Sequence, residues 1–240
     1  MAGDDSGMTA LVLLPGMDGT GLLLEDFVAS MGANADVVLM RYPCDEPLGY
    51  PELETNVRAR LPQDRPFVLL GESFSGPIAI SIAATPPANM RGLILTCTFA
   101  RIPTWRGFRA LARFLPPINM PIVRLVRRRL LGPKDSPKFR TLLDRASAQL
   151  APAARKARLC AVLDVDVTDR LSRIAMPVLY LRASQDLVIP RAASESLLQH
   201  LPHMRIEEFP APHALLQTMP DEAGRVIERF MADCDNAVRI

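Results

Sequence analysis

The chain has 240 residues, of which 49% are hydrophobic and 22% are charged, and its formal net charge at pH 7 is +2. That balance is typical of a globular protein of one domain, or of one domain with an insert, and it excludes a disordered chain. The 22 prolines and 13 glycines exclude a long coiled coil. No apolar stretch reaches the roughly 18 residues that a membrane span needs, so we expect no transmembrane segment.

The four cysteines, Cys44, Cys97, Cys160 and Cys234, are scattered and show no spacing typical of a metal site. The chain has only three histidines, so we expect no bound metal and no cofactor. Unpaired cysteines indicate a reducing compartment. Residues 1–8 contain acidic side chains and lack the basic segment of a signal peptide. We therefore expect a cytoplasmic protein.

Six short apolar runs alternate with helical patterns along the chain. The first five are almost continuously apolar, as is typical of a parallel strand buried on both faces. The order strand, helix, strand predicts an α/β fold with helices on both sides of the sheet. The predicted strands are residues 9–14, 36–41, 66–70, 93–97, 177–181 and a weaker run at 204–209, and the predicted helices between them are 53–61, 77–84, 191–201 and 221–231.

A middle segment interrupts this alternation and contains no clear strand pattern. Its apolar side chains recur at helical spacing, which predicts a helical insert. The expected helices cover residues 105–115, 122–131, 139–150 and 153–163. We expect residues 1–100 and 169–240 to form the core domain and residues 101–168 to form a helical cap.

The insert also holds most of the positive charge. Residues 101–170 contain 16 Lys and Arg against 5 Asp and Glu, a net charge of +11, and the rest of the chain is net −9. Three interpretations stay open: a solvated face, attraction of an anionic substrate or an acidic acyl carrier protein, and attachment of Arg124 and its neighbours to anionic lipid. No aromatic interleaving or binding motif supports nucleic acid as a partner.

The strongest chemical signal is the hexapeptide GESFSG at residues 71–76. It follows a predicted strand and precedes a predicted helix, the context in which a sharp, strained turn presents a nucleophilic serine. The residues two positions from that serine must be small. Gly71 and Ser75 satisfy this requirement, although the usual pattern has glycine at the position of Ser75. Ser73 is therefore the candidate nucleophile, and a purely structural turn is the alternative.

A serine hydroxyl needs a base to remove its proton, and histidine usually serves. His213 follows the last predicted strand in the loop FPAPHAL, which can reach the carboxyl edge of the sheet. His200 and His203 lie at the end of a predicted surface helix, where they complement the helix dipole. We expect His213 to be the base, with a structural loop histidine as the alternative.

The base needs an acid that orients its ring and stabilises its cation. Asp186 follows the fifth predicted strand in the segment SQDLVIP, and helix capping is its structural alternative. The chain order Ser73, Asp186, His213 is the one expected for an α/β hydrolase. The rival aspartates precede that strand, in or beside the insert; they are Asp164, Asp166 and Asp169.

Two backbone N–H groups must converge on the oxyanion that forms in acyl transfer. One is expected from Phe74, the residue after the nucleophile. The other is expected from the glycine-rich loop at residues 15–21, and we choose Met17 as the donor. That loop has neither the lysine nor the complete glycine pattern of a phosphate-binding loop, which argues against nucleotide binding.

These segments, in this order, resemble the α/β-hydrolase superfamily over nearly the whole chain. The chain is similar to small, capped bacterial members that hydrolyse carboxylic esters. Within them, residues 169–190 and the compact cap resemble pimeloyl-carrier-protein methyl ester esterases. The opening PGMDGTG resembles plastid phytyl ester synthases, which are acyltransferases.

The resemblance implies an α/β-hydrolase fold with a mostly parallel sheet, and a serine esterase that forms an acyl-enzyme. Serine at the nucleophile position excludes relatives that use aspartate there, the haloalkane dehalogenases and epoxide hydrolases. Two features depart from the family. Pro15-Gly16 replaces the usual His-Gly before the oxyanion residue, and we expect the chain to lack the one or two strands that usually precede the first predicted strand. We therefore expect a sheet of about six strands.

The cap is expected to shape the pocket for a small-molecule ester. Candidate pocket residues recur on one face of the first cap helix, although packing between the cap and the core is the simpler interpretation; they are Trp105, Phe108, Leu111 and Leu115. The pattern does not separate an esterase from a thioesterase or an acyltransferase acting on carrier-bound acyl groups. A catalytically silent ligand-binding protein of the same fold is the alternative outside enzymes.

Overall fold

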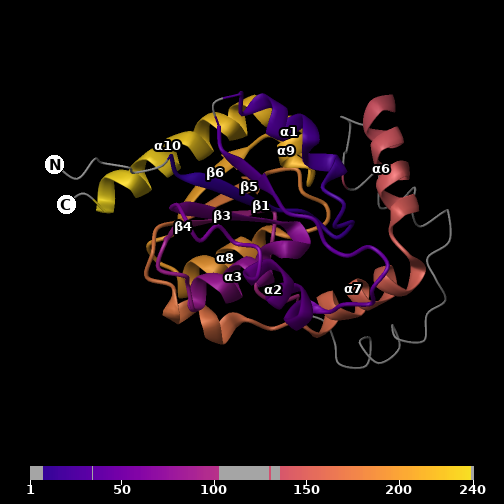
Figure 1. Ribbon diagram of the computed structural model, residues 1–240, viewed down its shortest axis with the longest axis horizontal. Helices are drawn as coiled ribbons and strands as arrows, with labels where there is room; N and C mark the ends of the chain where they lie inside the picture. The colour runs from indigo at the N-terminus through magenta and orange to yellow at the C-terminus, as the bar shows by residue number, and fades with distance from the viewer. Residues whose placement is uncertain (1–7, 34, 103–129, 131–135, 239–240) are drawn as a thin grey trace.

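A computed structural model describes residues 8–33, 35–102, 130 and 136–238 of the chain (Figure 1). Its six strands form one parallel sheet in the order β2-β1-β3-β4-β5-β6. The predicted parallel sheet of about six strands is therefore confirmed, and each strand coincides with one predicted apolar run. The strands are β1 (Ala10–Leu14), β2 (Val37–Leu39), β3 (Phe67–Glu72), β4 (Met90–Thr96), β5 (Val178–Ala183) and β6 (Arg205–Phe209).

Helices cover both faces of the sheet (Figure 1). One face carries α2 (Tyr50–Arg58), α3 (Gly76–Ala84) and α8 (Arg191–His200), all near predicted positions. The other face carries α1 (Glu25–Ser30), α9 (Leu215–Thr218) and α10 (Pro220–Val238), of which α1 and α9 were not predicted. Both are short, and so few turns give little periodic signal.

The side chains of β1 alternate between two apolar cores. Ala10, Val12 and Leu14 face the core under α2 and α3, whereas Leu11 and Leu13 face the core under α1 and α10. All five residues are at most 1% exposed. Full burial of one Val or Leu side chain contributes about 1.5–3 kcal/mol, so a strand that supplies both cores stabilises the sheet strongly.

The sheet topology places a switch point at the carboxyl end of β1. This strand lies between β2 and β3, so the connections that leave β1 and β3 diverge. Ligands of open parallel sheets bind in the crevice at such a switch point. Because Leu14 pairs with Gly71, the loop at residues 15–21 and the turn at Ser73 begin side by side at that edge.

Two helices of the insert are described, α6 (Pro137–Gln149) and α7 (Pro152–Asp164). Phe139 of α6 packs with Ala214, the residue after His213. The Val167 N–H donates to the Ala100 carbonyl at 3.1 Å, so the two ends of the insert lie together. The predicted helix at 105–115 and most of that at 122–131 lie outside the described residues. No helix in the described ranges is long and apolar enough to span a bilayer.

Candidate active site

Ser73 sits on a strained turn between β3 and α3. Its φ is 49°, in the left-handed region that non-glycine residues rarely adopt. A Cβ on Gly71 would come within 2.7 Å of the Ala79 Cβ and 2.9 Å of the Ser75 carbonyl oxygen, so only glycine fits there. A Cβ on Gly76 would overlap the Thr98 side chain. The small residues of the hexapeptide therefore let the strand, the turn and the helix approach closely enough to hold Ser73 at the sheet edge.

Ser73, His213 and Asp186 form a continuous hydrogen-bonded chain. Ser73 Oγ lies 2.8 Å from His213 Nε2, and His213 Nδ1 lies 2.8 Å from Asp186 Oδ2. A carboxylate can only accept a hydrogen bond, so Nδ1 carries the ring proton and Nε2 is left to accept the serine proton. This is the protonation state that a general base for Ser73 requires.

Asp186 is held in place through both carboxylate oxygens. Oδ1 accepts backbone hydrogen bonds from Val188 at 2.7 Å and Ile189 at 2.9 Å, while Oδ2 faces His213. The side chains of Asp186 and His213 are each only 6% exposed. A carboxylate that is buried and has both oxygens hydrogen-bonded can orient the imidazole and stabilise its cation. Val188 and Ile189 precede α8, whose N-cap is Pro190 without a side-chain hydrogen bond, so the helix-capping interpretation of Asp186 is wrong.

The rival residues lie elsewhere. Asp166 bonds its own neighbour Thr168 and pairs with Arg101 at 3.6 Å. His200 and His203 are exposed and contact backbone carbonyls of Ser196 and Met176. Within the described chain, Asp186 and His213 are thus the acid and the histidine that the fold brings to Ser73.

The loop at residues 15–21 forms a tight turn next to Ser73. The Gly19 N–H donates to the Gly16 carbonyl at 3.1 Å, which places Met17 and Asp18 at the tip. The Met17 N–H has no acceptor among the described residues, whereas the Met17 carbonyl accepts from Arg158. The Phe74 carbonyl accepts from the Tyr50 hydroxyl at 2.9 Å, and the two rings stack at 4.7 Å. Both candidate oxyanion residues are therefore fixed by neighbouring contacts.

Glu72 is a buried acid beside Ser73 that sequence reasoning missed. It is 7% exposed and accepts a 2.7 Å hydrogen bond from Gln217. Burial raises its pKa to about 7, against the opposing effects of the Gln217 hydrogen bond and the Gly16 backbone N–H. A charged residue next to the predicted nucleophile, on a strand otherwise buried, was the signal that could have identified it.

Ser75 replaces the usual glycine for a reason visible in its contacts. Its hydroxyl donates to the Pro15 carbonyl and contacts the buried Tyr42 hydroxyl at 2.5 Å. Because the single hydroxyl proton of Ser75 is donated to the Pro15 carbonyl, the Tyr42 hydroxyl must be the donor in its bond to Ser75. The serine thus connects the turn at Ser73 to the loop after β1.

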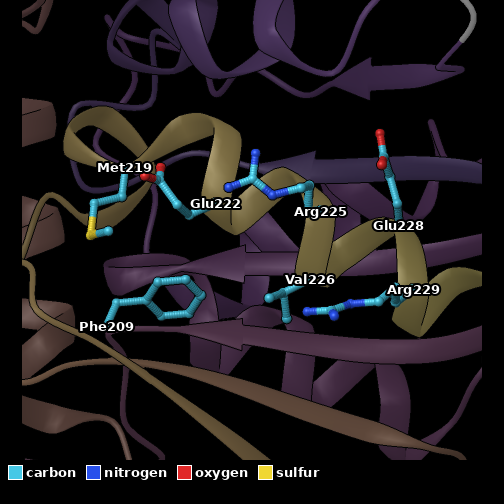
Figure 2. A pocket seen from close by; sticks show the side chains of 7 residues that line it. All are labelled: Phe209, Met219, Glu222, Arg225, Val226, Glu228 and Arg229. Atoms are coloured by element: carbon cyan, nitrogen blue, oxygen red, sulfur yellow. The ribbon is translucent and has the colours of Figure 1, made fainter.

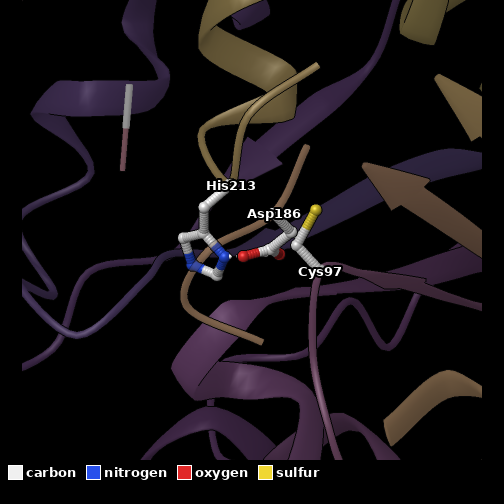
Figure 3. A group of neighbouring side chains, drawn as sticks. All are labelled: Cys97, Asp186 and His213. Carbon is white, nitrogen blue, oxygen red and sulfur yellow. Dashed lines mark hydrogen bonds and ion pairs between the residues drawn. The ribbon is translucent and has the colours of Figure 1, made fainter. Parts of the chain in front are cut away.

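Cys97 lies against the Asp186–His213 pair (Figure 3). The Sγ, one carboxylate oxygen and one ring nitrogen all lie within 4.8 Å of one another, a spacing that a metal ion could bridge. Burial first, and then the charge of Asp186, raise the pKa of the Cys97 thiol well above its usual range. Cysteine binds metal as the thiolate, and the raised pKa keeps Cys97 protonated. These three residues are therefore poorly suited to hold a metal ion.

The predicted pocket residues Trp105, Phe108, Leu111 and Leu115 lie outside the described residues, so the pocket stays a prediction. A groove of about 570 Å³ runs between α2 and α7 and includes Ile78 and Val165. A second groove of about 490 Å³ runs along α10 and combines Phe209 and Met219 with two acidic and two basic side chains (Figure 2). Neither groove is lined by Ser73 or His213.

Comparisons with known proteins find hydrolases. A family model described as "Serine aminopeptidase, S33" matches residues 52–216. The pimeloyl-[acyl-carrier protein] methyl ester esterase of Vibrio parahaemolyticus is 27% identical and covers 93% of this chain and 94% of its own. The 3-oxoadipate enol-lactonase 2 of Acinetobacter baylyi is 27% identical over 67% of this chain and 62% of its own. A hydrolase of Oleispira antarctica superposes with a TM-score of 0.81 at 14% identity, over 94% and 92% of the two chains.

Proposed function

The chain belongs to the serine aminopeptidase S33 family of hydrolases, and from that premise we propose that it hydrolyses carboxylic esters through an acyl-enzyme on Ser73. The observation that carries the proposal is the hydrogen-bonded chain from Ser73 through His213 to Asp186. A serine hydroxyl is a weak nucleophile, and a base already bonded to it, itself oriented by a buried carboxylate, is the arrangement that activates it.

In the first step, His213 Nε2 takes the hydroxyl proton while Ser73 Oγ bonds to the ester carbonyl carbon. The carbonyl electron pair moves onto oxygen, and the Met17 and Phe74 N–H groups are the proposed donors to that oxyanion. Asp186 stabilises the imidazolium that results. Collapse of the intermediate expels the alcohol, which receives the proton from His213. Water then repeats the sequence on the acyl-enzyme and releases the acid.

The relatives support an ester substrate over the alternatives. Two of them are named as a methyl ester esterase and an enol-lactonase, and both names describe cleavage of an ester bond. The same triad would serve a thioesterase or an acyltransferase, and a silent protein could keep the fold, but none of these is favoured by the comparisons. We propose that residues 101–168 form the cap over this site, with Trp105, Phe108, Leu111 and Leu115 as its pocket-lining residues.

The finer proposal is that the acyl group arrives on an acidic carrier protein. Several relatives act, by name, on a pimeloyl group attached to acyl carrier protein. The two described cap helices expose four basic side chains, which would attract such a carrier; they are Lys138, Arg140, Arg145 and Lys156.

The direct test is hydrolysis of p-nitrophenyl esters, from acetyl to palmitoyl, by the wild type and by Ser73→Ala. Ser196→Ala, on the outer helix α8, is the matched control. We expect Ser73→Ala to lower kcat by at least about 10⁴-fold, because loss of a nucleophile removes the whole acyl-enzyme route. A Ser73→Ala variant that keeps a tenth of the wild-type kcat would overturn the proposal. A thioester and an aminoacyl p-nitroanilide, measured alongside, separate esterase from thioesterase and aminopeptidase activity.

A further inference from the structure

Arg158 on α7 is a cation buried out of contact with water. It is 0% exposed, although it belongs to the basic insert, where surface charge was expected. No carboxylate of the described residues pairs with it within 4.0 Å, and its Nε has no hydrogen-bond partner. A charge held this way is costly, so its remaining contacts must compensate for the lost hydration.

Its hydrogen bonds go to three backbone carbonyls, two in the loop after β1 and one in the segment after β2, and the Cys44 side chain also interacts with it. Nη1 donates to the carbonyls of Met17 and Asp18, each at 2.8 Å, and Nη2 donates to that of Pro43 at 2.7 Å. The guanidinium also lies 5.6 Å from the centre of the Tyr42 ring, within range of a cation–π interaction. One side chain of the cap therefore binds both residues at the tip of the oxyanion loop.

Gly19 makes room for this guanidinium. Its φ is 69°, and a Cβ at this position would overlap Arg158 Nη1 and come within 3.0 Å of the Tyr42 Cβ. The left-handed backbone and the missing side chain thus form a cradle that arginine fills.

A chain of hydrogen bonds leads from Arg158 to the Met17 N–H. Arg158 Nη1 donates to the Asp18 carbonyl at 2.8 Å. The amide of that same peptide unit is the Gly19 N–H, which donates to the Gly16 carbonyl at 3.1 Å. The amide of the Gly16 peptide unit is in turn the Met17 N–H. Hydrogen bonds linked in this way polarise one another, so a cation at one end strengthens the donor at the other.

We propose that Arg158 is a positioning residue that holds the oxyanion loop to α7 and, through two peptide units, makes the Met17 N–H a stronger oxyanion donor. The inference rests on the proposed function, since it needs Met17 to face the developing charge. Its consequence is specific: Arg158 stabilises the transition state and contributes little to binding of the uncharged substrate. A merely structural arginine would affect stability and leave the chemistry of the remaining folded enzyme unchanged.

The experiment compares Arg158→Met, Arg158→Lys and Arg158→Ala with the wild type on the best p-nitrophenyl ester. Arg155→Met is the matched control, because Arg155 lies on the same helix and also binds backbone carbonyls, those of Ser147 and Leu150, away from the oxyanion loop. Thermal unfolding of each variant is recorded, and kcat is normalised to the folded fraction. Guanidinium ion at non-denaturing concentration is added to Arg158→Ala as a chemical rescue.

We expect Arg158→Met to lower kcat by about 10- to 100-fold with KM within about twofold, less than the loss of a whole oxyanion donor. Arg158→Lys should recover part of the rate, guanidinium should raise kcat of Arg158→Ala alone, and Arg155→Met should keep the wild-type kcat. Equal kcat in Arg158→Met and Arg155→Met, or a change confined to KM or stability, would overturn the inference. Ser73→Ala separates the two failures: an active Ser73→Ala refutes the proposed function itself, whereas an inactive one beside a fully active Arg158→Met refutes the role of Arg158 only.

Discussion

Gln217 Nε2 donates a 2.7 Å hydrogen bond to Glu72 Oε1, across 145 positions of the chain. Glu72 immediately precedes Ser73, and Gln217 lies on α9, just beyond His213. The same carboxyl group interacts with the backbone N–H of Gly16. One buried acid therefore connects the segments that carry the proposed nucleophile, base and oxyanion donor.

The buried acid should make stability depend on pH in an unusual direction. Burial raises the pKa of Glu72 to about 7, above its ordinary value, so the folded state holds the proton more tightly than the unfolded chain. The stabilisation is complete below the unfolded pKa and is lost as pH rises through the folded pKa. We expect the Glu72 contribution to lower the free energy of unfolding of the wild type by about 2.5 kcal/mol between pH 5 and pH 8.

Urea unfolding of the wild type and of Glu72→Gln across that range measures this contribution. Glutamine cannot ionise, so the variant should lack the decline and become more stable than the wild type at pH 8. Glu228→Gln removes an exposed carboxylate on α10 and should follow the wild-type curve. Parallel curves for the wild type and Glu72→Gln would mean that Glu72 titrates normally.

Asp186→Asn tests the assignment of the acid. An amide at this position can donate to His213 Nδ1, which favours the ring tautomer with its proton on Nε2 and removes the acceptor for the Ser73 proton. We expect kcat to fall by about 10⁴-fold, as for the corresponding Asp→Asn change in a serine protease with the same three catalytic residue types, with little change in the fold.

Asp166→Asn is the comparison, because Asp166 was the rival in sequence and bonds Thr168 on the surface. Its kcat on the same ester should remain within about twofold of the wild type, as for a surface change away from the site. A large loss in Asp166→Asn together with an active Asp186→Asn would transfer the role of acid to the insert.

The sheet could be predicted from sequence because its strands carry their signal locally. Several of the apolar runs stop directly before proline or glycine, as the first does at Leu14 before Pro15, and buried parallel strands need little else. The helix α9 could not be predicted, because four residues give no period. Its position depends on packing of Leu215 and Leu216 under α10, a contact that the local sequence does not encode.

The candidate site divides in the same way. Ser73 and His213 stood out because a turn pattern and a scarce residue type are visible in the sequence alone. Arg158 was hidden among many basic residues of the insert, since only the tertiary structure buries it against the Met17 carbonyl. Glu72 was hidden within the hexapeptide, because its burial depends on Gln217 from a distant helix.

The bond between Tyr42 and Ser75 predicts a double-mutant cycle in which the two single variants lose unequal amounts of stability. Ser75→Ala removes the acceptor of the buried Tyr42 hydroxyl and the donor to the Pro15 carbonyl, leaving two polar groups unpaired. It should lower the free energy of unfolding by about 2–6 kcal/mol, at about 1–3 kcal/mol for each buried unpaired group.

Tyr42→Phe should cost less than Ser75→Ala, about 1 kcal/mol, because Ser75 keeps its bond to Pro15. The double variant should lose less stability than the two single variants lose in sum. With phenylalanine at position 42, Ser75→Ala leaves no tyrosine hydroxyl without a partner. Urea unfolding of the four proteins gives the coupling free energy, expected at about 0.5–2 kcal/mol. Strict additivity would show that the two hydroxyl groups do not interact in the folded protein.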